Sequence, residues 1–405
     1  MYVTPFGRLF AASAVSNLGD GLRLAALPLL AASLTRDPGA VAAMTAVIWL
    51  PWLLFGAIGG AIVDRVHRVR LLMLVQLGRM LVVATLAVLV WTGAASMTLL
   101  YLAAFLFGIG EMLADTTMQT LVPALVPSDD LERANGRLFA SQSVANEFVG
   151  PPMGSVLFST IPAAPFAASA VAWGTSALAL SRLEIAQPSR EGRPATSLLQ
   201  EIVEGGRWLF GQPILRALAV WAVFVNASIA AFTSIEVLFA LEVLGIPEVA
   251  YGFLAAAAGA GGITGTLLAA WAVRRFGRSR VVQAGSSLHG LSALAAGLLP
   301  HPLLFATLLF LMTAAAAAVI IVLTALRQTI VPGRMLGRMV ATTRVFGYGA
   351  LPVGALFGGW LATTFDLRTP FVLGGIVILL AGLLIGRWLT PHAIEAARAA
   401  AHGGG

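Results

Sequence analysis

A short charged turn constrains the fold of this chain more than any other feature, because it lies between two long uncharged runs and returns half a chain later. The first copy follows Gly60 and reads Asp64-Arg65-Val66-His67-Arg68-Val69-Arg70. The second copy reads Arg274-Arg275-Phe276-Gly277-Arg278-Ser279-Arg280. The apolar runs beside each copy are long enough to cross a bilayer. Two copies at this distance predict a duplicated unit.

The composition favours a membrane protein. Of 405 residues, 59% are hydrophobic and 11% are charged, and the mean hydropathy is +0.90. A soluble domain carries about 25% charged residues, so we expect this chain to be surrounded by lipid. It has no cysteine, its five histidines are scattered, and it has no phosphate-binding loop. We therefore expect no metal site, no cofactor and no enzymatic activity.

Twelve apolar runs reach the length of about 20 residues that a membrane span needs. They predict an all-α membrane protein whose twelve transmembrane helices form two pseudo-symmetric six-helix bundles. The first run carries Asp20 and Arg23 in its middle, so it is not a cleaved signal peptide. The predicted spans are 8–34, 41–63, 70–92, 97–121, 136–160, 164–182, 213–241, 248–273, 281–299, 302–326, 338–363 and 369–390.

The arginines predict the orientation of these spans. All 25 basic residues are arginine; with both termini inside, only Arg36 and Arg368 fall in outer loops. Arg23, Arg79 and Arg344 fall within spans, and the other twenty lie on the inner side. This bias predicts a multi-pass protein of the bacterial inner membrane with cytoplasmic termini. It also explains the net charge of +7 without nucleic acid as a partner.

The spans divide the chain into four parts. Residues 1–182 are the predicted N-terminal bundle, and 213–390 the C-terminal bundle. Between them, 183–212 is a cytoplasmic linker in which Leu198, Leu199, Ile202 and Leu209 fall near one face of an amphipathic helix. We expect the tail, 391–405, to be disordered.

Further matches between the halves support the duplication. Gln119-Thr120-Leu121-Val122-Pro123 closes the fourth span, as Gln328-Thr329-Ile330-Val331-Pro332 closes the tenth. Asn17 in the first span has its counterpart in Asn226 in the seventh. Pro152-Met153-Gly154 likewise matches Pro352-Val353-Gly354. Two related halves predict a central cavity and rocking of one half against the other.

The Gly-x-x-x-Asp-Arg-x-x-Arg turn resembles the loop between helices 2 and 3 of the major facilitator superfamily. Three further segments resemble its enterobactin-exporter and macrolide-efflux branch of drug:proton antiporters: Asn17-Leu18-Gly19-Asp20-Gly21, Glu204-Gly205-Gly206-Arg207 and Leu336-Gly337-Arg338. The resemblance implies a secondary transporter that exports small amphipathic organic molecules of the drug, macrolide or siderophore type. Uptake or lysolipid flipping by the same fold, and a transport-inactive membrane sensor, are the alternatives.

In the family this turn packs on the neighbouring half, and its Asp helps to lock one conformation. The resemblance gives that role to Asp64, which shares the turn with Gly60, Arg65 and Arg68. A carboxylate near the N-terminus of the eleventh span, or near an arginine such as Arg344, can break and re-form a charged contact as the halves move. The alternative is that the arginines only set the topology.

Four carboxylates within spans are candidates for carrying a proton. Glu147 is the first choice, because no arginine is near it in sequence; Asp20 is the second, unless Arg23 holds it as an ion pair. Glu111 and Asp115 share one helical face, where both can reach the cavity or meet Arg79 or Arg137.

A helix bend is predicted where Gly150-Pro151-Pro152-x-Gly154 resembles the tail of the antiporter motif. Asn17, Arg23, Asn226 and Glu236 are candidate cavity-lining residues. The predicted partners are a small-molecule substrate, protons and the lipid bilayer, and we expect the protein to be a monomer.

Overall fold

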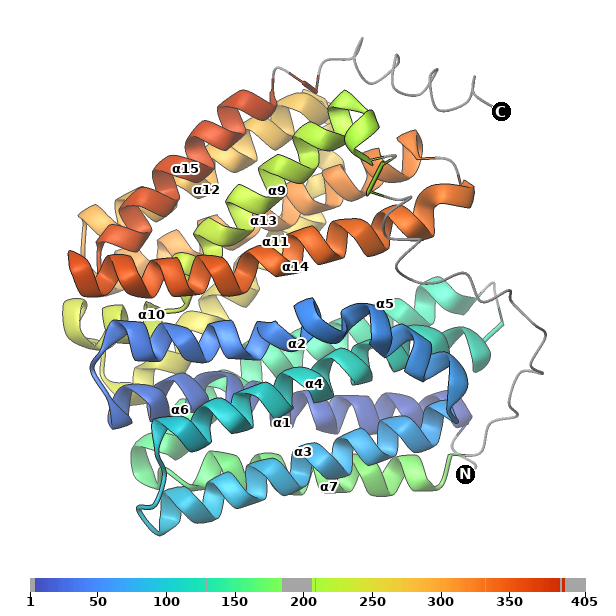
Figure 1. Cartoon of the computed structure of the whole chain (residues 1–405), viewed down its shortest axis with the longest axis vertical. Coiled ribbons are helices and arrows are strands. Elements are labelled where there is room, and N and C mark those ends of the chain that lie inside the picture. The colour runs from blue at the N-terminus through green and yellow to red at the C-terminus, as the bar shows by residue number, and fades with distance from the viewer. Residues whose placement is uncertain are drawn as a thin grey trace. The chain divides into compact units, whose positions relative to one another are not determined.

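The computed structural model describes residues 4–127, 130–183, 206–207, 209–331, 333–386 and 388–389. Side chains in these ranges are described except those of 57–62, 64–65, 328, 333–342 and 344–345. Most of the predicted linker helix and the predicted tail lie outside the described residues. Every regular element within the described ranges is a helix, which confirms the all-α prediction (Figure 1).

In the first half, the predicted spans correspond to helices whose bounds differ from the expected ones by a few residues. The fifth span is not one uniform helix: α5 passes into the π-helical turn η3 and then into α6. The elements are α1 (Pro5–Leu34), α2 (Pro38–Arg65), α3 (Arg68–Trp91), α4 (Met97–Leu121), η1 (Val122–Ala124), α5 (Leu131–Ser143), η3 (Val144–Val149), α6 (Gly150–Thr160) and α7 (Ala164–Ser181).

The second half repeats this order, and here the seventh span is the interrupted one. The elements are α9 (Pro213–Thr233), α10 (Glu236–Leu238), the π-helical turn η4 (Phe239–Val243), α11 (Glu248–Phe276), α12 (Arg278–Leu298), α13 (Pro302–Ile330), α14 (Gly333–Thr364) and α15 (Thr369–Ile385). Taken together, the described helices form twelve segments, in agreement with the predicted count. Six of them are each long and apolar enough, in one unbroken stretch, to cross a membrane.

Residues at the helix starts explain several of these bounds. Pro5 stands in the first turn of α1, and the Thr4 hydroxyl before it accepts a hydrogen bond from the Gly7 amide at 3.1 Å. The Ser96 hydroxyl caps α4 in the same way by accepting from the Leu99 amide at 3.4 Å. Both caps satisfy amides that a helix start leaves without intrahelical partners.

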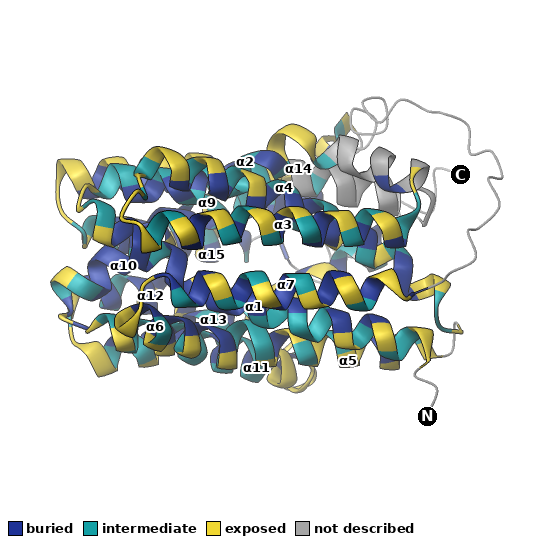
Figure 2. Ribbon diagram, turned by 90° about the horizontal axis from the view of Figure 1, so that it is seen from below, coloured by how far each residue is buried: buried dark blue, intermediate teal, exposed yellow. Residues whose placement is uncertain are grey.

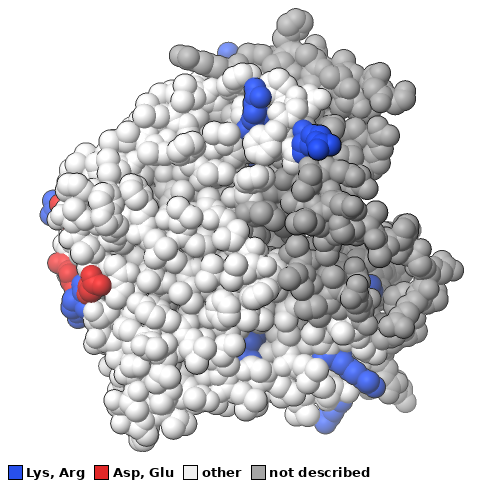
Figure 3. Space-filling view, in the orientation of Figure 1, with Lys and Arg blue, Asp and Glu red and all other residues white. Residues whose placement is uncertain are grey.

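The helices carry exposed apolar faces. On α3, Leu74, Leu81 and Val88 follow one another at intervals of seven residues and are 60%, 61% and 61% exposed. Figure 2 shows exposed residues alternating with buried ones along this helix. Figure 3 shows a face with few charged side chains on it. Leucine and valine faces of this kind suit lipid tails, as expected for a multi-pass membrane protein.

The contacts divide the chain into two compact units. Unit 1 comprises Met1–Arg36, Val47–Pro194 and Ile246–Ala256, and unit 2 comprises Asp37–Ala46, Ala195–Gly245 and Ala257–Gly405. The unit boundary therefore falls within α2 and within α11. The first turns of α2 belong to unit 2 and the rest of α2 to unit 1, whereas the first turns of α11 belong to unit 1 and the rest of α11 to unit 2. Within unit 1, a small residue of α6 contacts the first turn of α11: the Ser155 hydroxyl donates to the Val249 carbonyl at 3.1 Å.

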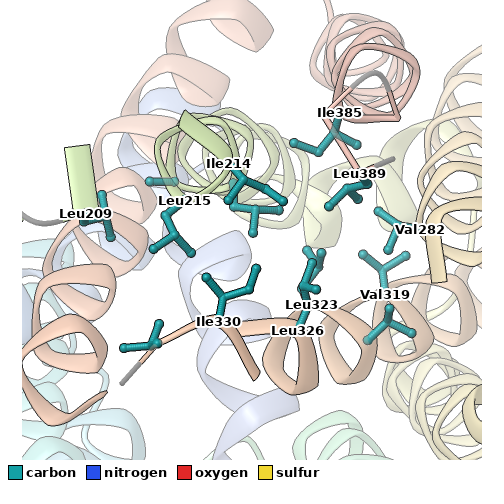
Figure 4. Close-up of a cluster of buried hydrophobic side chains, with 14 of the residues drawn as sticks. Leu209, Ile214, Leu215, Val282, Val319, Leu323, Leu326, Ile330, Ile385 and Leu389 are labelled. Carbon is teal, nitrogen blue, oxygen red and sulfur yellow. The ribbon is translucent and has the colours of Figure 1, made fainter. Parts of the chain in front are cut away.

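Each unit has its own apolar core, and the two cores use equivalent positions of the repeat. In unit 1 the core includes Leu72, Leu121 and Leu180. In unit 2 the corresponding residues are Val282, Ile330 and Ile385, which Figure 4 shows converging from α12, α13 and α15. Burial of equivalent side chains in both units supports the duplication read from the sequence.

The predicted bend region packs closely on α1. A Cβ added to Gly150 would lie 2.5 Å from the Gly21 Cα, and one added to Gly21 would lie 2.4 Å from the Ala145 carbonyl oxygen. Only glycine fits at such distances. The π-helical turn η3 lies just before Gly150, and turns of this type are frequent at functional sites.

Candidate functional site

A cavity of about 460 Å³ lies within unit 1, between α1, α3, α4, α5, η3 and α7. Its wall is unusually polar for a membrane bundle. The polar and charged residues that line it are Ser13, Ser16, Asn17, Asp20, Arg23, Gln76, Arg79, Glu111, Asp115, Gln119, Asn135, Gln142, Asn146 and Ser176. Charged side chains inside a membrane span are costly, so a group of them on one cavity wall makes this cavity the candidate functional site.

An ion-pair cluster forms the centre of this wall. Asp20 on α1 accepts from Arg79 on α3, and its Oδ1 lies 3.7 Å from the Arg23 Nη2 one turn along its own helix. The same Arg23 nitrogen lies 3.6 Å from Glu111 Oε2 on α4. Two arginines and two carboxylates therefore join three helices. We name Asp20, Arg23, Arg79 and Glu111 the charged cluster.

The members of the charged cluster differ in their access to the cavity. The Arg23 and Arg79 side chains are 6% and 5% exposed, and that of Asp20 is 15% exposed. The Glu111 side chain is 41% exposed. Among these four groups, Glu111 is therefore the one that a proton or a bound molecule reaches first.

Aromatic rings hold both guanidinium groups in place. The Arg79 guanidinium lies 4.2 Å from the ring centre of Trp173, and that of Arg23 lies 5.0 Å from the ring centre of Phe107. The two rings pack on each other with centres 5.7 Å apart. A cation over an aromatic face is attracted by the ring, more so where water is excluded.

A hydrogen-bond network that sequence reasoning missed continues from Arg79. Gln76 Oε1 accepts from Arg79 at 3.5 Å, and Gln76 Nε2 donates to the Ser16 and Ser176 hydroxyls at 2.7 and 3.3 Å. The Trp173 indole donates to the Ser16 carbonyl at 3.2 Å. Gln76 could have been found, because it is the one amide in its span and stands one turn before Arg79.

The cavity wall has hydrogen-bonding capacity to spare. Within the described part of the chain, the buried Nε atoms of Arg23 and Arg79 and the Oδ1 of Asn146 have no hydrogen-bond partner. Buried polar groups in native proteins are nearly always satisfied, by protein, water or ligand. This wall is therefore suited to hold water or the polar end of a bound molecule.

The other predicted acids lie in different surroundings. Asp115 lines the cavity together with Glu111, as their spacing on one face predicts. Glu147 lies in η3, partly exposed, and is not part of the cavity wall, although its neighbour Asn146 is. Arg23 and Arg79, the two arginines of the cavity wall, pair with Asp20 and Glu111 and not with Glu147.

Of the predicted gating residues, only Arg68 has a described side chain. Its guanidinium donates to the Thr120 carbonyl at 3.5 Å, near the end of α4. A cation is favourable there because the last carbonyls of a helix carry partial negative charge. Gly60 falls within α2, and the side chains of Asp64, Arg65 and Arg344 are not among those described.

Two of the predicted cavity-lining residues, Asn226 and Glu236, belong to unit 2 and not to the charged cluster. The Asn226 amide donates to the Gly347 carbonyl at 3.3 Å and lines a small pocket of unit 2. Glu236 opens α10, where it is partly exposed.

Solved structures match this fold over nearly its whole length. A bacterial homologue of the iron transporter ferroportin, in an inward-facing state, superposes with a TM-score of 0.76 at 16% identity, covering 95% of this chain and 98% of that one. The nucleoside transporter NupG gives a TM-score of 0.75 at 12% identity, covering 97% and 100%. At these identities the likeness shows the fold alone.

Sequence comparison identifies the family. An uncharacterized MFS-type transporter of Sinorhizobium fredii is 26% identical, over 93% of this chain and 92% of that protein. The multidrug efflux pump Tap of Mycolicibacterium fortuitum is also 26% identical, over 93% of each chain. The family model described as transmembrane secretion effector matches residues 2–402. The chain therefore belongs to the transmembrane secretion effector family of the major facilitator superfamily and is a multi-pass membrane transporter.

Proposed function

We propose that this protein exports small amphipathic organic molecules in exchange for protons, by alternating access across the bacterial inner membrane. The observation that carries the proposal is the charged cluster on the cavity wall of unit 1. The similarity to a multidrug efflux pump supports export of drug-like compounds. The cavity wall is also apolar in part, with Leu9, Leu24, Met118 and Leu138 among its residues, which suits an amphipathic molecule.

The charge balance of the cluster suggests how substrate and proton exclude each other. With both acids ionised, two arginines and two carboxylates sum to zero. Protonation of Glu111 leaves one positive charge in excess, and a bound organic cation adds one as well. Since excess charge in a buried site is costly, the cavity favours one of the two cations at a time. Exchange of one proton for one monovalent cation then leaves the net charge of the loaded site unchanged, at one positive charge in excess.

In this scheme Glu111 is the carrier, because it is the most exposed acid of the charged cluster and meets a single described arginine. Asp20 is not the carrier in this scheme, since its carboxylate is paired with the guanidinium groups of both Arg23 and Arg79. Glu147 is the alternative carrier: no ion pair is described for it, and it lies in a π-helical turn beside the tightly packed Gly150.

The test is transport by the full-length protein in proteoliposomes with an imposed pH gradient. The panel contains rhodamine 6G, tetraphenylphosphonium, ethidium and erythromycin, with empty liposomes as the control. We expect pH-driven accumulation of at least one organic cation. Failure of every compound to move with the gradient, with properly folded protein in the membrane, would contradict proton-coupled export of this class.

Three variants then assign the carrier. Glu111→Gln mimics the protonated form, so it should lose pH-driven accumulation while retaining downhill exchange of the same compound. Glu147→Gln should keep both if Glu111 is the carrier, and Asp20→Asn should lower the amount of folded protein. Loss of pH-driven transport in Glu147→Gln alone would transfer the role to Glu147.

We further propose that Asp64 contributes to a conformational lock, as the family turn implies. One charged contact between the halves can shift a two-state balance by about 1–3 kcal/mol, so Asp64→Ala should shift the resting state only partly. The measurement is the accessibility of single-cysteine probes placed on the inner and outer ends of the cysteine-free protein. Unchanged accessibility, together with normal transport, would reduce the turn to a topology signal.

A further inference from the structure

Unit 2 contains a small pocket in which three buried polar atoms have no described hydrogen-bond partner. The pocket, of about 60 Å³, lies between α9, α12, α13 and α15. Three of its polar atoms, Trp221 Nε1, Ser286 Oγ and His289 Nε2, are buried and have no hydrogen-bond partner in the described part of the chain. Ser286 is 3% exposed and His289 is 6% exposed. Because buried polar groups are nearly always hydrogen-bonded, three such atoms around one cavity indicate a site for water or for a hydrogen-bonding ligand.

The residues of this pocket occupy the positions of the sequence repeat that the charged cluster and Gln76 occupy in the first half. Nine residues after the equivalent Arg70 and Arg280 come Arg79 and His289, and three residues before these come Gln76 and Ser286. Asp20 and Ile229 each follow the matched Asn17 and Asn226 by three residues.

The fourth and tenth spans also place a pocket residue of unit 2 at the position of a charged-cluster residue of unit 1. Glu111 stands eight residues before the matched Gln119, and Ile320 stands eight residues before Gln328. Ile229, Ser286, His289 and Ile320 all line the pocket of unit 2.

The substitutions remove every charge from this copy of the site. Isoleucines replace both acids, and Phe232 takes the position of Arg23, with its ring centre 6.4 Å from that of His289. What remains without a described partner is an indole N–H, a hydroxyl and an imidazole. Asn226 also lines the pocket, but its amide donates to the Gly347 carbonyl, and no carboxylate is among the lining residues. The indole donates only, and the other two can donate. The pocket therefore suits a neutral group that accepts hydrogen bonds.

The size of the pocket limits that group. A water molecule takes up about 30 Å³ in the liquid, so the pocket has room for about two waters or for one group of the size of a carbonyl. We propose that Trp221, Ser286 and His289 form an uncharged subsite, occupied by water at rest, that binds a carbonyl or ether oxygen of the substrate. The substrate part of this inference rests on the proposed export function, whereas the solvated pocket does not.

Binding to the purified full-length protein in detergent tests the subsite with two organic cations. Rhodamine 6G has an ester carbonyl, and tetraphenylphosphonium has no hydrogen-bond acceptor. His289→Leu and Ser286→Ala should each weaken rhodamine 6G binding about 2- to 12-fold, the value of one net hydrogen bond, and leave tetraphenylphosphonium binding unchanged. Ser292→Ala is the matched control, because Ser292 is a buried serine of α12 that does not line the pocket.

Equal losses for both probes, or no loss for either, would overturn the subsite. If the wild type binds neither probe, the substrate class proposed above fails. A measurement without ligand then tests whether the pocket holds water. Hydrogen exchange of the tryptophan indoles by NMR supplies it, with assignment by Trp221→Phe. The Trp221 indole should exchange at least 10-fold faster than that of Trp173, which donates to the Ser16 carbonyl. Exchange as slow as that of Trp173 would show a pocket closed to water and refute the inference.

Discussion

The charged cluster makes a quantitative prediction about stability. Asp20→Asn removes the carboxylate that lies between Arg23 and Arg79, whose side chains are 6% and 5% exposed. Arg23 then keeps its contact with Glu111, whereas Arg79 loses the one carboxylate described beside it. Removing one partner of a buried ion pair costs about 3–5 kcal/mol, because the other charge stays buried without compensation. Since whole proteins are stable by about 5–15 kcal/mol, this loss is severe.

Arg79→Gln should lower the free energy of unfolding by a similar amount. The arginine described beside Asp20 is then Arg23, at 3.7 Å, and the stack of the Arg79 guanidinium on Trp173 is lost. The double variant removes one charge of each sign and keeps the site neutral. We expect it to be more stable than the sum of the single losses predicts, by about 1–3 kcal/mol. The assay is unfolding of the full-length protein in mixed detergent micelles, followed by tryptophan fluorescence and checked by the yield of folded protein.

The control cycle combines Arg79→Gln with Asp366→Asn, because Asp366 shares no described partner with Arg79. This pair should be additive to within about 0.5 kcal/mol. If Asp20→Asn and Arg79→Gln are additive to the same degree, the two groups do not act as a buried ion pair, and the reasoning about the cavity wall is wrong.

Three further predictions concern topology, packing and a loop. Reporter fusions at 94–96, 161–163 and 301 should report outside and those at 67, 190 and 278 inside; one robust inversion would contradict the six-plus-six arrangement. Gly150→Ala should lower stability in the same assay by about 1–3 kcal/mol, because its Cβ would meet Gly21, whereas Gly78→Ala has open space and should gain up to about 1 kcal/mol; equal effects would refute the packing argument. Burial works to raise the pKa of Asp366, but hydrogen bonds from Thr369 and Arg368 and the Arg368 charge outweigh it and lower that pKa below 3.8. This lowered pKa means that the carboxylate stabilises the fold above pH 3.8, so Asp366→Ala should cost about 1 kcal/mol at pH 7 and progressively less as the pH falls through the folded pKa; a pH-independent loss would contradict this.

The sequence predicted the helices well, because membrane spans must be long, apolar and bounded by arginines or turns. The contact between Asp20 and Arg23 was one of two alternatives open from the sequence, since residues three apart on a helix are neighbours, and the structure shows this contact. The interruptions of the fifth and seventh spans were not predicted as π-helical turns, because the residues of a stretch such as Val144–Val149 are compatible with either kind of helix.

Contacts between helices were harder to derive. The pair of Asp20 with Arg79 depends on the rotation and depth of α1 and α3, which one sequence does not determine. For the same reason Glu147 ranked above Glu111 in the sequence, whereas in the structure Glu111 lines the cavity and Glu147 does not. The sequence repeat already aligns His289 with Arg79. That His289 lines a pocket could be seen only in the structure.

Coupling itself can be measured most directly as proton movement driven by substrate. Proteoliposomes loaded with a pH indicator, at equal pH inside and out and with the membrane potential clamped, receive the panel compound that the protein transports fastest. We predict that its inward flux makes the interior alkaline in proportion to the compound transported, and that Glu111→Gln abolishes the pH change while leaving downhill exchange. Substrate flux without any change in internal pH would contradict proton-coupled export through the charged cluster.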